Sequence, residues 1–310
     1  MLIFHAIGTT ICRMKENQSS ITASGIAVAR AVESEKPEGV RICFDPYAEK
    51  FLNPWFYRFT RFFIVTGYTE RSGPGVTGYL VARARYMDDT LQACLDAGLQ
   101  QLVILGAGYD SRAYRFEQLR QPVSRDEDRT KGLRVFEVDH PATQQAKINK
   151  VRKTLGELPA HVTYVGVDFI TQTLEERLPA CGYDERLKTF FIWEGVVMYL
   201  SAEAVDNTLS FIAHHSGSGS QVIFDYVYTA LLDGTVRHGE VSRMRRARRF
   251  SGEGLTFGIP EGTVQAFLER RGFTNVRNVT SDDLHQRYFT GPNAKRKVAW
   301  GYGIALAEKE

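Results

Sequence analysis

The stretch of residues 103–112 constrains the fold of this chain more than any other. Its apolar run ends abruptly in Gly106-Ala107-Gly108, and a polar turn then leads into a helical pattern. This pattern is typical of a buried parallel strand that passes into a nucleotide-binding loop. The glycines let the backbone approach a ligand where a Cβ atom would clash, and a helix that begins near Ser111 would direct its free N–H groups to the same place.

A second apolar strand pattern, over residues 133–138, ends in Asp139. An acid at this point can accept hydrogen bonds from ribose hydroxyls. The dinucleotide-binding pattern requires a third glycine, where this chain has Ser111, so the loop suits a nucleoside ligand without a pyrophosphate. S-adenosylmethionine fits, with its aminoacyl arm over the glycines. An NAD-dependent oxidoreductase and a non-catalytic cofactor-binding protein remain alternative classes.

Composition excludes several other classes. The 310 residues are 43% apolar and 24% charged, as in an ordinary soluble protein, and the net charge of +3 is too small to indicate a nucleic acid partner. No apolar run has membrane-spanning length, and residues 2–12 lack the basic start of a signal peptide, so no membrane partner is expected. The cysteines have no metal-ligand spacing and look like reduced thiols of a cytoplasmic protein without a metal: Cys12, Cys43, Cys94 and Cys181.

From residue 101 onward, strand and helix patterns alternate, which predicts a parallel sheet with helices on both faces. Strands are expected at residues 101–105, 133–138, 161–167, 189–193, 220–227, 275–280 and 298–308, the last of them antiparallel. Helices are expected at residues 21–34, 76–97, 141–154, 202–215 and 261–272. A further helix is predicted to begin in residues 44–49, with Asp45 as N-cap and Pro46 in its first turn.

Two segments allow more than one interpretation. The aromatic residues of 55–63 pack inside the protein or form a ring-lined substrate pocket. The basic stretch within residues 228–258 forms a solvated helix over the site, or a lid that attracts an anionic substrate. Nucleic-acid binding by this stretch is less favoured, because the rest of the chain offsets its charge.

Several motifs in a fixed order support a family resemblance. They are Ala29-Arg30-Ala31, Phe44-Asp45-Pro46-Tyr47-Ala48, Ala82-Arg83-Ala84-Arg85-Tyr86-Met87-Asp88-Asp89, the glycine loop through Arg115, Phe136-Glu137-Val138-Asp139-His140-Pro141, Val167-Asp168-Phe169 and Trp193-Glu194-Gly195. The set resembles the leucine carboxyl methyltransferase-like family, most closely its bacterial branch, over residues 22–307.

The resemblance implies an α/β class I methyltransferase fold with a Rossmann-like sheet. Seven strands are expected, mostly parallel with an antiparallel last strand. Residues 1–98 would form an N-terminal arm and helical cap, and residues 99–310 the S-adenosylmethionine-binding domain, with a lid at about 228–258. The implied reaction is O-methylation of a small molecule, with S-adenosylhomocysteine as product. The acceptor would carry a carboxylate or an acidic hydroxyl and would therefore be anionic.

By the same resemblance, Arg83 would bind the carboxylate of the cofactor's methionine moiety. A guanidinium fits a carboxylate through two parallel hydrogen bonds. Eukaryotic relatives use a first-helix lysine as well, but this chain has Ala27 at the aligned position, so Arg83 must provide more of the contact. Arg85, two residues further along the same predicted helix, is its rival.

The remaining implied contacts lie at the ends of predicted strands. The full cofactor-binding set is Arg83, Gly106, Ala107, Gly108, Asp139, Asp168, Phe169 and Glu194. Asp168 would accept the adenine amine, with Phe169 beside it. Glu194 would face the cofactor's ammonium or sulfonium. Glu137, on the same side of its strand as Asp139, assists it or serves as an ion-pair partner.

The sequence does not identify a catalytic base. A carboxylate acceptor is ionised at neutral pH and needs none, whereas a phenol would benefit from one. His140, His238 and His285 are candidates, and no pattern selects among them.

Overall fold

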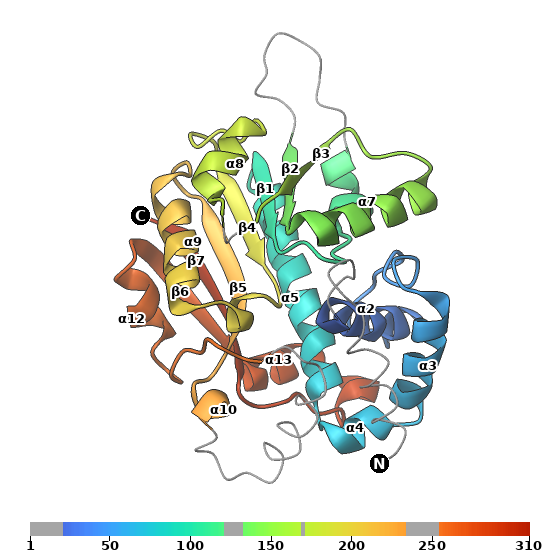
Figure 1. The fold of residues 1–310 in the computed structure, drawn as a ribbon. Helices are drawn as coiled ribbons and strands as arrows, with labels where there is room; N and C mark the ends of the chain where they lie inside the picture. The colour runs from blue at the N-terminus through green and yellow to red at the C-terminus, as the bar shows by residue number, and fades with distance from the viewer. Residues whose placement is uncertain (1–20, 121–132, 169–170, 234–253) are drawn as a thin grey trace.

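A single seven-stranded sheet forms the centre of the computed structural model, which describes residues 21–120, 133–168, 171–233 and 254–310 (Figure 1). Its strands are β1 (Gln101–Leu105), β2 (Arg134–Asp139), β3 (Val162–Gly166), β4 (Thr189–Trp193), β5 (Gln221–Val227), β6 (Phe273–Thr280) and β7 (Tyr302–Lys309). They lie in the order β3-β2-β1-β4-β5-β7-β6. β1 to β5 pair in parallel, whereas β7 is antiparallel to β5 and β6, so the predicted sheet is confirmed.

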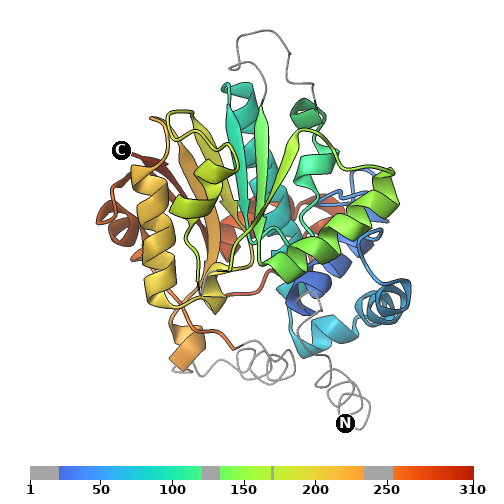
Figure 2. The same ribbon diagram turned by 45° about the horizontal axis from the view of Figure 1, so that its top comes forward.

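Helices cover both faces of the sheet, as the alternation of strands and helices predicts. In β1, Leu102 and Ile104 join one apolar core, and Val103 and Leu105 join the other. The first core includes α5 (Val76–Asp96), α7 (Pro141–Leu155) and α13 (Ser281–Tyr288). The second core includes α8 (Leu174–Ala180), α9 (Ala202–His214) and α12 (Val264–Glu269). The turned view in Figure 2 shows α7 and α9 on opposite sides of the strands.

The helices that precede β1 gather on one side of α5 (Figure 1). They are α2 (Ile21–Ser34), α3 (Pro54–Val65) and α4 (Tyr68–Ser72). The helix predicted to begin near Asp45 is wrong, because residues 46–51 form turns instead. The Asp45 carboxylate does accept the N–H groups of Tyr47 and Ala48, at 3.1 and 3.0 Å. No helix could continue from there through Asn53, because Pro54 disfavours helical backbone at that residue, which instead caps α3.

Two other predicted helices differ from the structure. The helix after the glycine loop, α6 (Arg112–Arg115), is a single turn, and the N–H of Arg112 donates to Asp110 Oδ1 at 2.7 Å. The helix N-terminus expected near Ser111 is therefore short, and one of its N–H groups is occupied. The helix expected at residues 261–272 is confined to α12. The predicted lid falls mostly on residues 234–253, outside the described residues, between α10 (Ala230–Asp233) and residue 254.

Candidate functional site

A cavity of about 330 Å³ lies at the carboxyl ends of β1, β2 and β4. Ligands bind at this edge in open α/β sheets. Of the predicted site residues, those that line the cavity are Arg83, Gly106, Ala107, Gly108, Asp139 and Glu194. The cavity lining does not include Asp168, and Phe169 lies outside the described residues. The cavity thus brings together residues from α5 and from the ends of three strands.

The glycine loop requires glycine at Gly106. Its φ is +64°, and a Cβ atom there would lie 2.4 Å from Cγ2 of Val196, which follows β4. The Ala107 N–H donates to the Val138 carbonyl at 3.0 Å, which fixes the loop against the end of β2. The loop is therefore closely packed on two neighbouring strand ends.

Asp139 is held by backbone N–H groups. Its Oδ2 accepts from Gly108 at 2.6 Å and its Oδ1 from His140 at 2.7 Å. Burial raises the pKa of Asp139, although these two hydrogen bonds oppose the shift. A carboxylate has about four lone-pair sites, so both oxygens retain acceptor capacity toward the cavity.

Glu137 has different partners. Its Oε1 lies 2.8 Å from Lys147 Nζ, and its Oε2 accepts from the Tyr114 hydroxyl at 2.8 Å. The residue is only 1% exposed and does not line the cavity. Of the two interpretations of Glu137, the geometry favours the ion-pair partner.

Arg83 lies in the cavity wall with its guanidinium buried. Its Nη1 donates to Asp225 Oδ2 at 2.5 Å, and its Nε donates to Glu194 Oε1 at 3.0 Å. Its Nη2 lies 2.9 Å from the same glutamate oxygen, yet it makes no hydrogen bond. A buried donor without an acceptor is costly, so this nitrogen can accommodate an anionic group in the cavity. Arg85 does not line the cavity; it pairs with Asp89 at 2.7 Å, and its side chain is 46% exposed.

Glu194 is ion-paired on both oxygens. Oε1 faces Arg83, and Oε2 lies 2.7 Å from Arg112 Nη1. Burial by itself would raise the pKa of Glu194, but the charges of Arg112 and Arg83 outweigh it and lower the pKa well below its usual range. A buried carboxylate requires a cation, and the protein supplies two.

Sequence reasoning did not identify three charged residues of this region. Asp225 is wholly buried in β5, where it accepts from the Gly195 N–H at 2.6 Å as well as from Arg83. Arg112 also pairs with Asp88 and Asp110. Arg30 of α2 lines the cavity, and it donates to the Asp45 carboxylate and the Tyr109 carbonyl. Most of these partners are distant in sequence, so no local pattern reveals the pairs. For Arg112, the one indication in the sequence was that it lies in the family motif that ends at Arg115.

Among the candidate bases, only His140 borders the cavity within the described part of the chain. Its ring is exposed, and its Nδ1 accepts from the Ala142 N–H at 3.3 Å. His285 lies elsewhere, 3.0 Å from the Arg296 carbonyl, and His238 falls outside the described residues. The described residues contain no His, Cys, Asp or Glu cluster that could hold a metal ion. In the same ranges, no helix is both long and apolar enough to cross a membrane.

Comparison with known proteins gives one family. The family model for leucine carboxyl methyltransferase matches residues 23–213. The chain is 31% identical over 210 residues to the "Putative S-adenosyl-L-methionine-dependent methyltransferase YktD" of Bacillus subtilis, over 68% of this chain and 66% of that protein. It is 30% identical to a Mycobacterium avium protein of the same description, over 82% of this chain and 81% of the relative. The match to the Bacillus protein thus spans just under two thirds of that protein.

Two solved structures share the fold. A DUF574 family protein from Streptomyces avermitilis superposes with a TM-score of 0.55 at 14% identity, over 95% of this chain and 99% of that one. A "putative methyltransferase" from Thermobifida fusca superposes with a TM-score of 0.52 at 13% identity, over 96% and 97% of the two chains. The class I methyltransferase architecture expected from the sequence is therefore confirmed.

Proposed function

Because this chain belongs to the leucine carboxyl methyltransferase family, we propose that it transfers a methyl group from S-adenosylmethionine to an oxygen atom of a small anionic molecule. S-adenosylmethionine is the cofactor. The acceptor atom would belong to a carboxylate or an acidic hydroxyl. The observation that carries the proposal is one cavity lined by the glycine loop, by Asp139 and by Arg83, whose Nη2 makes no hydrogen bond. The division into a cap up to residue 98 and a catalytic domain after it stays a prediction.

The cavity residues fit the cofactor group by group. The backbone of Gly106 and Gly108 would pass under the aminoacyl arm, since both glycines line the cavity and neither carries a side chain. Arg83 Nη2 would donate to the methionine carboxylate, and the free lone pairs of Asp139 would accept the ribose hydroxyls. We retain Asp168 and Phe169 as predicted adenine contacts, although they are not part of the described cavity lining.

The protein's contribution to the reaction would be alignment and exclusion of water. When bound, the cofactor supplies a methyl group already activated by its sulfonium. Apolar side chains close the cavity around the strand ends, including Ile26, Leu105 and Trp193. Positioning of this kind can supply several kcal/mol of the barrier reduction in a displacement reaction. Glu194 would act through Arg83, because it holds the guanidinium at the cavity wall.

The groups around the cavity favour an acceptor that is ionised before it binds. The carboxylates of Glu194 and Asp110 are engaged by Arg112, and Asp139 accepts two backbone hydrogen bonds. His140 is the one histidine among the described residues of the lining. A carboxylate acceptor would need no base, since its pKa of about 4 leaves it charged at neutral pH. Its kcat/KM should therefore stay flat from about pH 6 to about pH 9.

A methyl-transfer screen tests the proposal. The enzyme is incubated with S-adenosylmethionine labelled in the methyl group and with panels of small carboxylic acids and of phenols. Treatment of the product with base then separates the two classes, because methyl esters release labelled methanol and methyl ethers do not. We expect label on oxygen in one panel, and label on nitrogen or carbon would contradict the proposal.

The two alternative classes predict other outcomes. A non-catalytic binding protein would bind S-adenosylhomocysteine but transfer no label to any acceptor. An NAD-dependent oxidoreductase is disfavoured by the family membership and by Ser111 at the third glycine position. Binding of NAD in preference to S-adenosylhomocysteine would favour the oxidoreductase class instead.

A further inference from the structure

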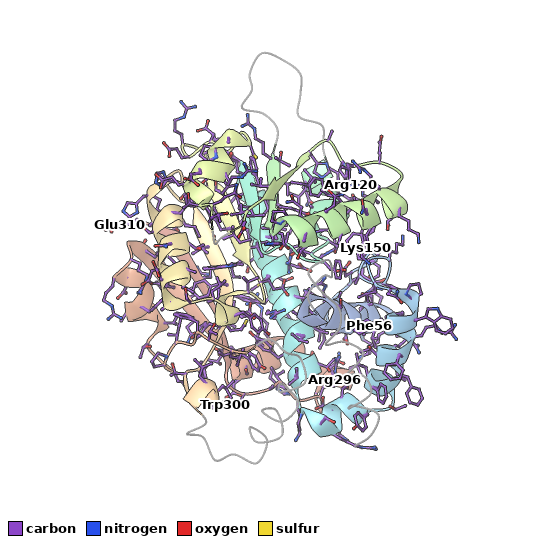
Figure 3. All side chains as sticks on the ribbon, viewed as in Figure 1. Phe56, Arg120, Lys150, Arg296, Trp300 and Glu310 are labelled. Atoms are coloured by element: carbon purple, nitrogen blue, oxygen red, sulfur yellow. The ribbon has the colours of Figure 1, made fainter. Side chains whose placement is uncertain are left out.

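An exposed aromatic surface on α3 is separate from the cavity and has no role in the proposed reaction. The apolar residues Trp55, Phe59, Phe62 and Val65 follow one another at spacings of three or four, so they form one stripe along the helix. We call these four residues the α3 stripe. They are 80%, 47%, 61% and 60% exposed, and Figure 3 shows side chains of α3 projecting away from the body of the protein.

The opposite side of α3 explains why the stripe faces outward. Tyr57 is buried, and its hydroxyl donates to Glu35 Oε1 at 2.5 Å. Phe56 and Ile64 pack against the core that contains α2. The helix is therefore fixed by one apolar side, and its second apolar side is left in solvent. Of the two interpretations of residues 55–63, neither a fully packed segment nor a ring-lined pocket describes the stripe, because its rings lie on the surface and not in the cavity wall.

The size of the stripe argues against a second copy of the chain as its partner. Aromatic side chains expose roughly 150–250 Å² each when fully free, so the stripe presents on the order of 500 Å². This is near the upper end for patches on monomers, about 300–600 Å². A stable dimer buries about 800 Å² on each partner. A single helix at the edge of the molecule falls short of that area.

The chemistry of the stripe instead fits a lipid surface. α3 contains no acidic residue, and Arg58 lies beside Trp55, with its guanidinium carbon 5.9 Å from the ring centroid. Helices that lie in the membrane interface combine Trp and Phe on one face with flanking Arg or Lys, and they prefer anionic lipids.

We propose that the α3 stripe docks this protein on the surface of an anionic lipid membrane. The aromatic side chains insert at the level of the headgroups, and Arg58 contacts lipid phosphates. The sequence predicts no membrane partner because it has no membrane-spanning segment. A helix that docks on the membrane surface does not need to span it, so the two statements are compatible. The proposal does not depend on methyl transfer, so either one can fail alone.

The test is co-sedimentation of the full chain with vesicles of phosphatidylcholine and phosphatidylglycerol, and with vesicles of phosphatidylcholine alone. We expect binding to the mixed vesicles, and a loss of on the order of tenfold or more in the partition coefficient for the double variant Trp55→Ser, Phe62→Ser. Trp55→Phe is the matched control, because it keeps an aromatic ring and should keep most of the binding. Thermal unfolding of each variant checks that the fold is intact, since the substituted residues are exposed.

Tryptophan fluorescence gives a second readout. Trp193 is buried and Trp300 is half-buried, so a blue shift on vesicle addition reports on Trp55 and should vanish in Trp55→Phe. Three results would overturn the proposal. One is equal sedimentation of wild type and the double variant. Another is protection of Trp55 from acrylamide quenching before lipid is added, which would mean that protein covers the stripe. The third is a wild-type dimer that the double variant dissociates, without any binding to vesicles.

Discussion

Asp139 at the end of β2 and Glu194 just after β4 are both carboxylates that line the cavity, but the protein holds them in opposite ways. Backbone N–H groups hold Asp139, and its pKa is raised by burial. Two guanidiniums hold Glu194, and its pKa is lowered. The first carboxylate retains acceptor capacity for a neutral hydroxyl, and the second has its charge balanced inside the protein. We infer that Asp139 contacts the ligand and that Glu194 positions Arg83.

Substitution of Glu194 should have the largest effect, and this effect should be on stability. Glu194→Gln leaves the positive charges of Arg83 and Arg112 less compensated in a buried site. Removing one partner of a buried ion pair costs about 3–5 kcal/mol, so the free energy of unfolding should fall by that amount in urea denaturation. Glu157→Gln, at an exposed position, is the matched control and should change little. Equal stability of the two variants would contradict the positioning role.

Substitution of Arg83 should have the next largest effect and should depend on the ligand. Arg83→Lys removes the guanidinium nitrogen that would bind the methionine carboxylate. The loss of a charge-assisted hydrogen bond costs about 1.5–3 kcal/mol, so affinity for S-adenosylhomocysteine should fall roughly 10- to 150-fold. Affinity for adenosine, which lacks the aminoacyl arm, should stay nearly constant.

Arg85→Lys is the control for that experiment. Arg85 is the rival from the sequence, and it pairs with Asp89 away from the cavity. The variant should bind both ligands as wild type does. A selective loss of S-adenosylhomocysteine binding in Arg85→Lys, with none in Arg83→Lys, would reverse the assignment.

The pH dependence should have a smaller effect and opposite signs for the two carboxylates. The raised pKa of Asp139 means that its contribution to stability is present below the ordinary aspartate pKa and is lost as pH rises through the raised value. The lowered pKa of Glu194 means that its contribution is present above the ordinary glutamate pKa and is lost as pH falls toward the lowered value. Asp139→Asn keeps one acceptor oxygen but places its amide NH2 against the other backbone N–H, so it should cost about 1–3 kcal/mol of stability in urea denaturation.

The pH dependence of ligand affinity tests the functional role of Asp139 directly. Ionised Asp139 would accept the ribose hydroxyls, so affinity should fall as pH drops below neutrality toward the raised pKa of this carboxyl. Calorimetric titrations across this range measure the fall. The fall should be weaker in Asp139→Asn, and an identical slope in wild type and variant would assign it to another group.

The sequence predicted the sheet better than it predicted the charges around it. β1 and β4 have their predicted bounds, because a buried parallel strand is a continuous apolar run with abrupt ends. The helix expected at Asp45 failed because a capping residue starts a turn as readily as a helix. Asp225 was not predicted because a single acid in an apolar strand reveals neither its burial nor its partner Arg83, which is 142 residues away.

The most direct test of the central claim is calorimetric titration of S-adenosylhomocysteine into wild type, Asp139→Asn and Glu137→Gln. Asp139 lines the cavity, and Glu137 on the same strand does not. We predict a loss of about 1.5–3 kcal/mol in binding free energy for Asp139→Asn, with the fold retained. We predict a clearly smaller loss for folded Glu137→Gln. Unchanged affinity in folded Asp139→Asn, or a larger loss in folded Glu137→Gln, would contradict the claim that the backbone-held carboxylate is the one that contacts the ligand.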